Sequence, residues 1–266
     1  MSESFIPVGA LGEGFAPAAD LLGETADLSG RTLTLNLDAP SAPSASSASS
    51  APTTLRIAEH TASWGGHTDV PVRVTSIRSG VYMIDGVADG VSTTFVADVE
   101  TGAVTQVEGR LPGAEARAES AYTRVRRGDE PTGVTARIVH GGIGGPPAAR
   151  HAPTTALVGL RNRYTYSPSE VYEHVYLTPD LYTWHCLRGV EQGLADTDRC
   201  HHVAIRDRLT LFVWREKIVP TLGLLLIDLD RMRTDGKIFG NQGFDAGAIV
   251  NFPVGARAEI LSAATA

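Results

Sequence analysis

Short runs of Tyr, Trp, Val and Leu alternate with turn residues through residues 163–240. Turn sequences such as SPS at 167–169 and RTDG at 233–236 separate these runs at strand-length intervals. β-Branched and aromatic residues favour extended strands, and clusters of Ser, Pro, Asp and Gly between them favour tight turns. The pattern therefore predicts an antiparallel meander, and most of the tyrosines of the chain fall inside it.

The two halves of the chain repeat one another. LSG at 28–30 corresponds to LVG at 157–159, and in each half an alternating run, a turn and a Trp-bearing run (Trp64, Trp184) follow. Further on, TTFVAD at 93–98 matches LGLLLID at 222–228. A repeated β-rich unit predicts two tandem antiparallel barrels, because closure removes the exposed sheet edges and leaves an interior for one small ligand. We therefore expect an all-β fold.

A Gly- and Pro-rich stretch at 141–147 marks the expected domain boundary. It gives an N-terminal barrel over residues 1–150 and a C-terminal barrel over residues 151–266. Residues 40–52 contain almost only Ser, Ala and Pro, so we expect a disordered loop there. A short helix is expected around 18–22, and a further pair of strands at 121–126 and 132–139.

Composition excludes several classes of function. The net charge of -7 offers no basic field that would attract nucleic acid or an anionic membrane. No apolar run approaches the roughly 18 residues of a membrane-spanning helix, no secretion signal is visible, and two cysteines do not make a disulfide framework. We expect a soluble cytoplasmic protein, of bacterial composition, and the sequence leaves a homodimer open.

Strand alternation groups the tyrosines of the second half. Residues two apart on a strand share a face, so Tyr164 and Tyr166 point one way, and Tyr172, His174 and Tyr176 share a face of the next strand. An alternative is that these tyrosines are only structural wall residues. In either case, these tyrosines lie in the segment 163–240, which also contains most of the candidate acid and base side chains of the chain.

A later strand places Phe212, Trp214 and Glu216 on one face. That combination suits a small pocket, in which rings provide burial and one carboxylate provides chemistry. Burial among rings raises the pKa of a carboxylic acid, which is the condition a general acid or base needs near neutral pH. The alternative is a salt bridge of Glu216 at the barrel rim.

Metal and nucleotide sites fit the sequence poorly. His174, His185, Cys186 and Cys200 lie near one another in the chain, but their spacing matches no zinc pattern. The Gly-rich stretch at 141–145 leads into prolines rather than a helix, unlike a phosphate-binding loop. We therefore expect neither a metal nor a cofactor.

The runs YEHVYL (172–177), YTWHCLRGVE (182–191), LFVWREKIVPTLG (211–223) and RTDGKIFG (233–240) closely resemble the C-terminal domain of the MoaF-like family. That family is named for molybdenum cofactor biosynthesis protein F, and the likeness spans about residues 157–260. The first half is similar to the family's N-terminal lipocalin-like domain. The resemblance implies two lipocalin-like (calycin) barrels, but it implies no particular reaction.

A shorter resemblance carries a mechanism. YTY at 164–166, VYE at 171–173 and WRE at 214–216 are similar to segments of the bacterial phenolic acid decarboxylases, which are cofactor-free lipocalin-type barrels. It implies that Tyr164 and Tyr166 orient or activate a substrate and that Glu216 transfers a proton. Arg199 would neutralise charge, with Arg188 as its competitor for that role.

The departures from that family imply a different substrate. Arg215 replaces the threonine of the family, and His174 stands where an aromatic wall residue is expected, so a simple hydroxycinnamate is not expected. The first half has no tyrosine pair and offers Asp85 in place of Glu216. It is therefore expected to be a degenerate, structural copy.

Two hypotheses of function follow. The preferred one is a cofactor-free lyase or isomerase that uses acid/base catalysis on a small, partly aromatic acid or enol. The alternative is a non-catalytic binding protein for a small molecule, of pterin or amine type. In both, the C-terminal barrel holds the ligand, and the expected substrate-binding residues are Tyr172, His174, Trp184, Phe212 and Trp214.

Overall fold

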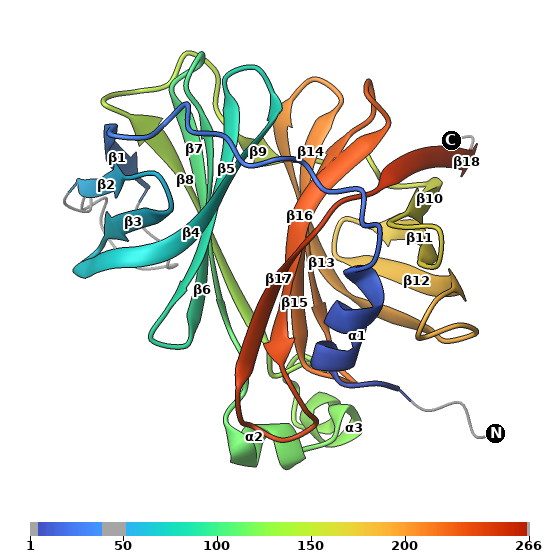
Figure 1. Cartoon of the computed structure of the whole chain (residues 1–266). Coiled ribbons are helices and arrows are strands. Elements are labelled where there is room, and N and C mark those ends of the chain that lie inside the picture. Colours follow the sequence, from blue (N-terminus) through green and yellow to red (C-terminus); the bar gives the residue numbers. More distant parts are fainter. Residues whose placement is uncertain (1–4, 39–51, 265–266) are drawn as a thin grey trace. The chain divides into compact units, whose positions relative to one another are not determined.

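The computed structural model describes residues 5–38 and 52–264, and strands dominate them (Figure 1). The predicted disordered loop at 40–52 lies outside the described residues except for Pro52. None of the helices in the described part of the chain has the length and apolar character that crossing a membrane requires. Two closed antiparallel barrels account for nearly all of the strands, which confirms the all-β prediction.

The first barrel closes when its last strand pairs with its first, Leu35 opposite Ile143. Its strands follow one another around the ring in chain order. They are β1 (Thr32–Leu37), β2 (Thr53–Ile57), β3 (Thr61–Trp64), β4 (His67–Arg78), β5 (Val81–Ala88), β6 (Val91–Asp98), β7 (Ala103–Arg110) and β8 (Thr135–Ile143).

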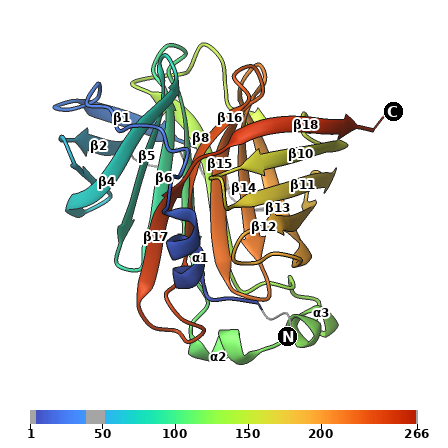
Figure 2. The same cartoon turned by 45° about the vertical axis from the view of Figure 1, so that its right-hand side comes forward.

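The second barrel closes through two contacts, β12 with β13 and β10 with β18. Figure 2 shows β18, β10, β11 and β12 as successive strands of this sheet. Its strands are β10 (Leu160–Thr165), β11 (Val171–Thr178), β12 (Leu181–Arg188), β13 (Ala195–Arg206), β14 (Leu209–Glu216), β15 (Thr221–Asp228), β16 (Arg233–Asn241) and β18 (Arg257–Ala263). Outside the ring, β17 (Ile249–Val254) pairs with β16, and β9 (Ala152–Pro153) lies beside β13.

The repeat seen in the sequence is present in the strand pairing. β4 and β13 both have 12 residues, and their pairing with the next strand shifts register at the same place, between Ser76 and Arg78 and between Ala204 and Arg206. β5 and β14 both have eight residues. Counted from the start of these strands, Ala88 corresponds to Glu216. The predicted correspondence of Asp85 with Glu216 is therefore wrong.

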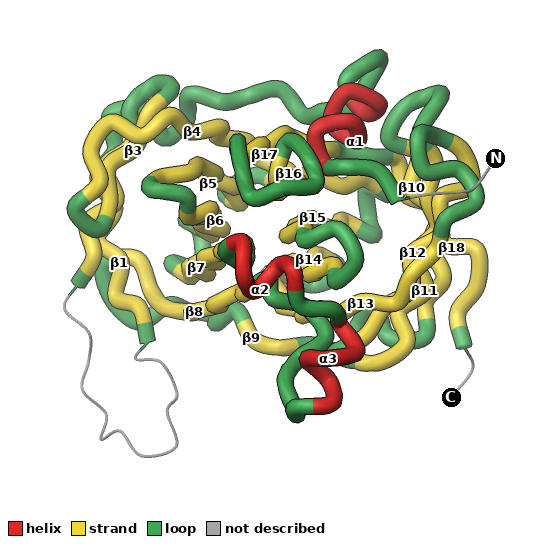
Figure 3. The backbone as a smooth tube through the Cα atoms, turned by 90° about the horizontal axis from the view of Figure 1, so that it is seen from below, coloured by secondary structure: helices red, strands yellow, loops and turns green. Residues whose placement is uncertain are grey.

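The helices differ from the sequence-based expectation. The first, α1 (Val8–Phe15), lies before the predicted position at 18–22. α3 (Ala121–Arg126) and α2 (Ala114–Ala118) occupy the connection between β7 and β8, as Figure 3 shows. The strand predicted at 121–126 is therefore wrong. Ser120 caps α3, since its Oγ accepts a hydrogen bond from Thr123 N at 3.1 Å, and this local cap favours a helix.

The chain divides into two compact units that are not continuous in sequence. One holds the first barrel and consists of Leu22–Gly109 and Ala136–Ala152. The other consists of the residues up to Leu21, Arg110–Thr135 and the residues from Pro153 onward. This grouping differs from the expected division at residue 150, because α1 and the connection between β7 and β8 pack with the second barrel.

Candidate functional site

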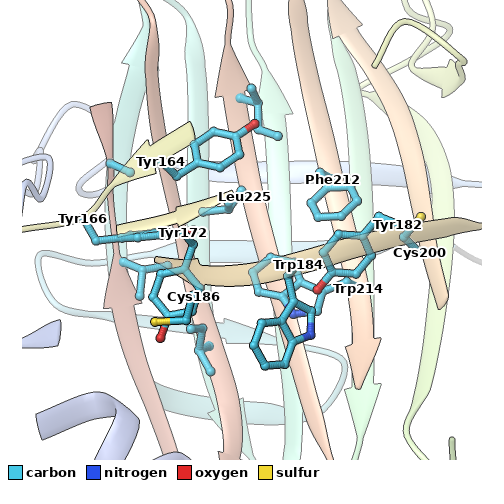
Figure 4. Close-up of a cluster of buried hydrophobic side chains, with 14 of the residues drawn as sticks. Tyr164, Tyr166, Tyr172, Tyr182, Trp184, Cys186, Cys200, Phe212, Trp214 and Leu225 are labelled. Atoms are coloured by element: carbon cyan, nitrogen blue, oxygen red, sulfur yellow. The ribbon is translucent and has the colours of Figure 1, made fainter. Parts of the chain in front are cut away.

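The interior of the second barrel is lined by aromatic rings. Figure 4 shows part of this cluster, with rings from β10, β11, β12 and β14 and from Tyr166, which follows β10. The faces predicted from the sequence are present: Tyr172 and Tyr176 on β11 are buried in this cluster, and so are Phe212 and Trp214 on β14. Phe212 stacks on Trp214 with ring centroids 5.5 Å apart, because the two lie on one face of β14.

A cavity lies at one end of this cluster. It offers about 30 Å³ of space that water could occupy. The residues that line it are Leu11, Phe15, Tyr166, Tyr172, His174, Tyr182, Trp184, Glu191, Trp214, Glu216 and Ile238. Among them are five of the predicted site residues besides Glu216, whereas Phe212 lies one ring deeper.

Glu216 is the last residue of β14 and is partly buried, with its carboxyl group at the cavity. Its Oε1 accepts a hydrogen bond from Trp214 Nε1 at 2.8 Å. Burial, followed by the nearby Asp198 and Glu191 carboxyls, raises the pKa of Glu216 well above its usual value. This agrees with the raised pKa expected from the sequence, although the carboxyl neighbours were not foreseen. The rim salt bridge is not present, since no Lys or Arg of the described chain pairs with Glu216.

The Trp214 ring fits beside Glu216 because β15 has a glycine, with no side chain, at the position opposite Trp214. Gly223 is paired directly with Trp214, and a Cβ there would lie 1.9 Å from the Trp214 ring. Only glycine allows such a close approach. The Gly223 position therefore fixes the direction in which the indole N–H points, and so the hydrogen bond to Glu216.

Glu191 is a site residue that the sequence analysis missed. It lies in the turn between β12 and β13, and its Oε2 accepts a hydrogen bond from the Tyr172 hydroxyl at 3.2 Å. Burial raises the pKa of Glu191 to about 7, and Glu170 adds to that rise while Tyr172 opposes it. Strand alternation says nothing about a turn residue, so no periodic signal could have found it.

The third carboxyl, Asp198, lies on β13. Trp184 Nε1 donates to its Oδ2 at 3.2 Å, and Lys217 N donates to its Oδ1 at 3.1 Å. Burial raises the pKa of Asp198 to about 6, and the Lys217 ammonium, 3.3 Å from Oδ1, works against that rise. Each predicted wall tryptophan thus donates its indole N–H to a carboxyl group.

His174 lies among rings, with its ring centroid 4.9 Å from that of Tyr164 and 5.2 Å from that of Tyr182. Burial lowers its pKa to about 3, so the imidazole stays neutral near pH 7. Tyr182 was also missed, but its parity with Trp184 on β12 could have identified it. His174 and Tyr182 therefore both contribute neutral, aromatic surface to the wall of the cavity.

The two tyrosines of the YTY motif have different environments. Tyr166 lines the cavity, and burial raises the pKa of its hydroxyl. The Tyr164 hydroxyl lies 2.7 Å from that of Tyr176 and accepts a hydrogen bond from Asn162 Nδ2 at 3.0 Å. Its ring centroid is 6.5 Å from that of Tyr166. Tyr164 therefore belongs to the core behind the cavity, and only Tyr166 of the two lines the cavity.

Arg199 is not brought to this cavity, contrary to the role implied by the decarboxylase resemblance. On β13 the neighbours Asp198 and Cys200 are buried toward the barrel interior, so Arg199 lies on the opposite face. In the ladder between β13 and β14, Arg199 lies directly opposite Arg215. The Arg215 guanidinium contacts the Glu130 carboxylate. Period-two alternation makes an inward Arg199 incompatible with an inward Asp198. The competitor Arg188 is exposed and donates to Pro168 O at 2.9 Å.

The residues considered for a metal are separated by the same alternation. His185 is exposed, while its neighbour Cys186 is buried in the barrel. Burial raises the pKa of Cys186 to about 11 and that of Cys200 to about 12, so both thiols stay protonated. Within residues 5–38 and 52–264, no three His, Cys, Asp or Glu side chains are placed to hold a metal ion.

The first barrel has a hollow of another kind. It is open, has a volume of about 500 Å³, and is lined mainly by turn and strand-end residues. They are Pro52, Thr53, Thr54, Arg56, Ser63, Trp64, Gly65, Gly66, His67 and Thr68. Among the described residues, no carboxyl group belongs to that lining, so the hollow lacks the acidic and aromatic combination of the second barrel.

The fold and the site together define a protein of two tandem lipocalin-like barrels, the second of which encloses an aromatic cavity with carboxyl groups. Comparison with known proteins gives the family. The N-terminal domain model of MoaF matches residues 3–113, and the MoaF C-terminal domain model matches residues 151–264. Protein MoaF of Klebsiella aerogenes is 45% identical over 265 residues, which cover 97% of this chain and 95% of that protein. The chain belongs to the MoaF family.

A solved structure was also found. The crystal structure of a proposed beta-lactamase from Burkholderia vietnamiensis matches with a TM-score of 0.34 and 8% identity, and the match covers 40% of this chain and 95% of that one. A likeness of this size carries no argument about function.

Proposed function

We propose that the C-terminal barrel binds a small organic amine, with its ammonium group held by Glu191 and Glu216 between aromatic rings. The observation that carries this proposal is a charge imbalance. Asp198 has the Lys217 ammonium 3.3 Å away, but neither Glu191 nor Glu216 has a Lys or Arg partner in the described chain. The lining residues that the structure describes include no Lys or Arg.

The rings around these carboxyls favour a cation further. Trp184, Trp214, Tyr166, Tyr172 and Tyr182 line the same cavity. The face of an aromatic ring attracts an ammonium group, and the attraction is strongest where water is excluded. A carboxylate and several ring faces together form a site for an alkylammonium group that carries an apolar or aromatic body.

A carboxylic acid ligand fits this cavity less well than the sequence suggested. Its carboxylate would lie beside Glu191 and Glu216, and like charges in a buried site repel. The arginine that was expected to neutralise it, Arg199, is on the outer face of the barrel. An uncharged pterin-type ligand would give neither carboxyl group a cationic partner.

The raised pKa values make amine binding a proton-coupled event. Without ligand, Glu191 with a pKa of about 7 is partly protonated at neutral pH, and burial and the neighbouring carboxyl groups also raise the pKa of Glu216. An ammonium group stabilises the ionised carboxylates, so binding releases protons to the solvent. Affinity for an amine should therefore increase as the pH rises from about 6 to 8, until the amine itself loses its proton.

Three probes that share a phenyl ring and differ in charge test the proposal: benzylamine, benzyl alcohol and benzoate. Calorimetric titration of the full chain at pH 7.5, in two buffers of different ionisation enthalpy, measures affinity and proton release together. We expect benzylamine to bind best, with proton release. Tighter binding of benzoate or benzyl alcohol would overturn the amine proposal.

Matched variants locate the binding. Glu216→Gln should weaken benzylamine binding by about 10- to 100-fold, the worth of a hydrogen bond to a charged group, and Glu191→Gln should reduce the released protons. Glu259→Gln is the control, because Glu259 lies on the exposed surface of β18, beside Arg163. An equal loss of affinity in the control would show that the effect is not local.

Acid/base catalysis remains the second candidate function. A carboxyl group with a pKa near 7, such as Glu191, is matched to proton transfer at neutral pH, and Glu216 lies in the same cavity. Turnover of a bound amine or enol should then fall by roughly 10²–10⁴ in Glu216→Gln. Arg199→Ala should leave turnover within about twofold, since its side chain is outside the barrel, and a large loss would restore the decarboxylase-like arrangement.

A further inference from the structure

The cavity of the second barrel has one wall that does not come from the barrel. α1 packs against β16 and β17 (Figures 1 and 2), and its Leu11 and Phe15 line the cavity. The Phe15 ring lies 4.8 Å from that of Tyr166 in an edge-on arrangement and 5.6 Å from that of Tyr172. An aromatic ring of this chain thus sits against the cavity tyrosines.

The remaining space is too small for the proposed ligand. The cavity offers about 30 Å³ to water, whereas an apolar cavity that binds benzene measures about 150 Å³. A benzyl group cannot enter unless part of the wall moves. Most of the barrel side of the wall lies on strands held by hydrogen-bonded ladders. The turns that carry Tyr166 and Glu191 are tied to the barrel by backbone hydrogen bonds, such as Tyr166 N to Glu170 O and Cys186 N to Leu194 O. The wall segment that lies outside the barrel is α1.

α1 is held to the barrel mainly by packing. Its only backbone hydrogen bond to the barrel in the described chain is from Gly9 N to Gln242 O, at 3.2 Å. Pro7 at its N-cap makes no side-chain capping bond, and its first turn carries no acidic residue. With Gly9, Gly12 and Gly14 inside eight residues, this segment has low helix propensity and is too short to be helical alone.

The same glycines allow α1 to seal the cavity closely. A Cβ at Gly12 would lie 3.0 Å from the Phe252 ring, and one at Gly14 would lie 2.6 Å from Val190 Cγ1. Leu11 and Phe15 are both buried. α1 thus combines a close fit in the docked position with little stability away from it, which is what a lid requires.

We infer that α1 is a removable lid of the C-terminal cavity, and that the Phe15 ring occupies the position that the ring of the ligand takes. Binding displaces Phe15 from Tyr166 and Tyr172, and α1 moves with it. The identity of the ligand rests on the proposed function. The contacts of α1 that define the lid do not.

Removing the Phe15 ring distinguishes a lid from an ordinary wall. In Phe15→Ala the competing ring is absent, so benzylamine should bind about tenfold tighter or more, because a larger fraction of molecules has an open cavity. If Phe15 were a wall that contacts the ligand, the same change would weaken binding, and this would overturn the inference. Phe244→Ala, at an exposed phenylalanine, is the control.

A disulfide can hold the lid closed. The close approach of residue 14 to Val190 places Gly14→Cys and Val190→Cys within reach of each other. The oxidised double variant should lose benzylamine binding by 100-fold or more, and reduction should restore it. Unchanged binding by the oxidised form would overturn the lid while leaving the amine proposal intact.

Hydrogen exchange tests the lid without any ligand. In the wild-type chain, the amides of residues 11–15 should exchange at least about 100-fold faster than those of β15, because α1 opens without unfolding of the barrel. Exchange of α1 as slow as that of β15 would overturn the lid. If none of the three benzyl or benzoate probes binds but the α1 amides exchange much faster than those of β15, the amine proposal is wrong and the lid inference is retained.

Discussion

The two barrels share a scaffold but differ in what their interiors hold. The fourth, sixth and eighth residues of β5 are Ile84, Gly86 and Ala88, whereas those of β14 are Phe212, Trp214 and Glu216. The first core consists mostly of Leu, Val and Ile with three rings, those of Trp64, Tyr82 and Phe95. The second core is dominated by Tyr and Trp.

The difference shows which features serve closure and which serve binding. The pair β4 and β5 has the same strand lengths and the same register shift as the pair β13 and β14, although the two pairs carry different side chains. A closed sheet therefore needs only alternating apolar residues and suitable turns. Glu216 and Glu191 contribute nothing to closure, and burial of their carboxyl groups disfavours the folded barrel when they ionise. Residues that cost stability and appear in one copy alone are the best evidence for a site.

The largest expected effect comes from removing a ring of the second core. Phe212 is fully buried, so Phe212→Ala should lower the free energy of unfolding of the second barrel by about 3–5 kcal/mol. It should also change benzylamine affinity. Ile84→Ala, its counterpart in the first barrel, should destabilise without changing that affinity. Urea unfolding followed by tryptophan fluorescence, together with titration, checks both, and an effect of Ile84→Ala on binding would break the comparison.

The second largest expected effect is a pH dependence of stability that Glu191 gives to the second barrel. The folded-state pKa of Glu191 is about 7, above its ordinary value of 4.5, so the protonated form favours folding. This contribution is complete below about pH 4.5 and is lost as the pH rises to about 7, a loss on the order of 2–3 kcal/mol.

Glu191→Gln should remove that loss. Relative to the wild type, the variant should therefore become more stable between pH 5 and pH 8, as measured by urea unfolding at each pH. Glu259→Gln provides the control for general effects of charge. A constant difference between Glu191→Gln and wild type across this range would show that Glu191 is not buried in the folded chain.

The smallest effect is expected from placing a carboxyl group in the first barrel. Ala88→Glu puts it at the position that corresponds to Glu216, but Gly86 stands where Trp214 donates its indole hydrogen bond. We expect a stability change within about 1 kcal/mol, since Ala88 is partly exposed, and no new benzylamine site. A second binding event in calorimetry would mean that one carboxyl group, without the rings, is sufficient.

The sequence by itself determined the repeat, the all-β class and the residues that share a face on each strand. It placed Phe212, Trp214 and Glu216 together, and the structure agrees, because alternation on a strand is a local property with a period of two. It also predicted a raised pKa for Glu216 from its aromatic neighbours. These inferences needed no knowledge of how the strands are arranged.

Tertiary structure decided everything that depends on segments far apart in the chain. It turned Arg199 outward, since Asp198 and Cys200 point inward on the same strand. It brought Glu191 from a turn to the cavity, and it closed that cavity with Phe15, far from the second barrel in sequence. Which loop or helix covers the end of a barrel depends on long-range packing, and no periodic pattern records it.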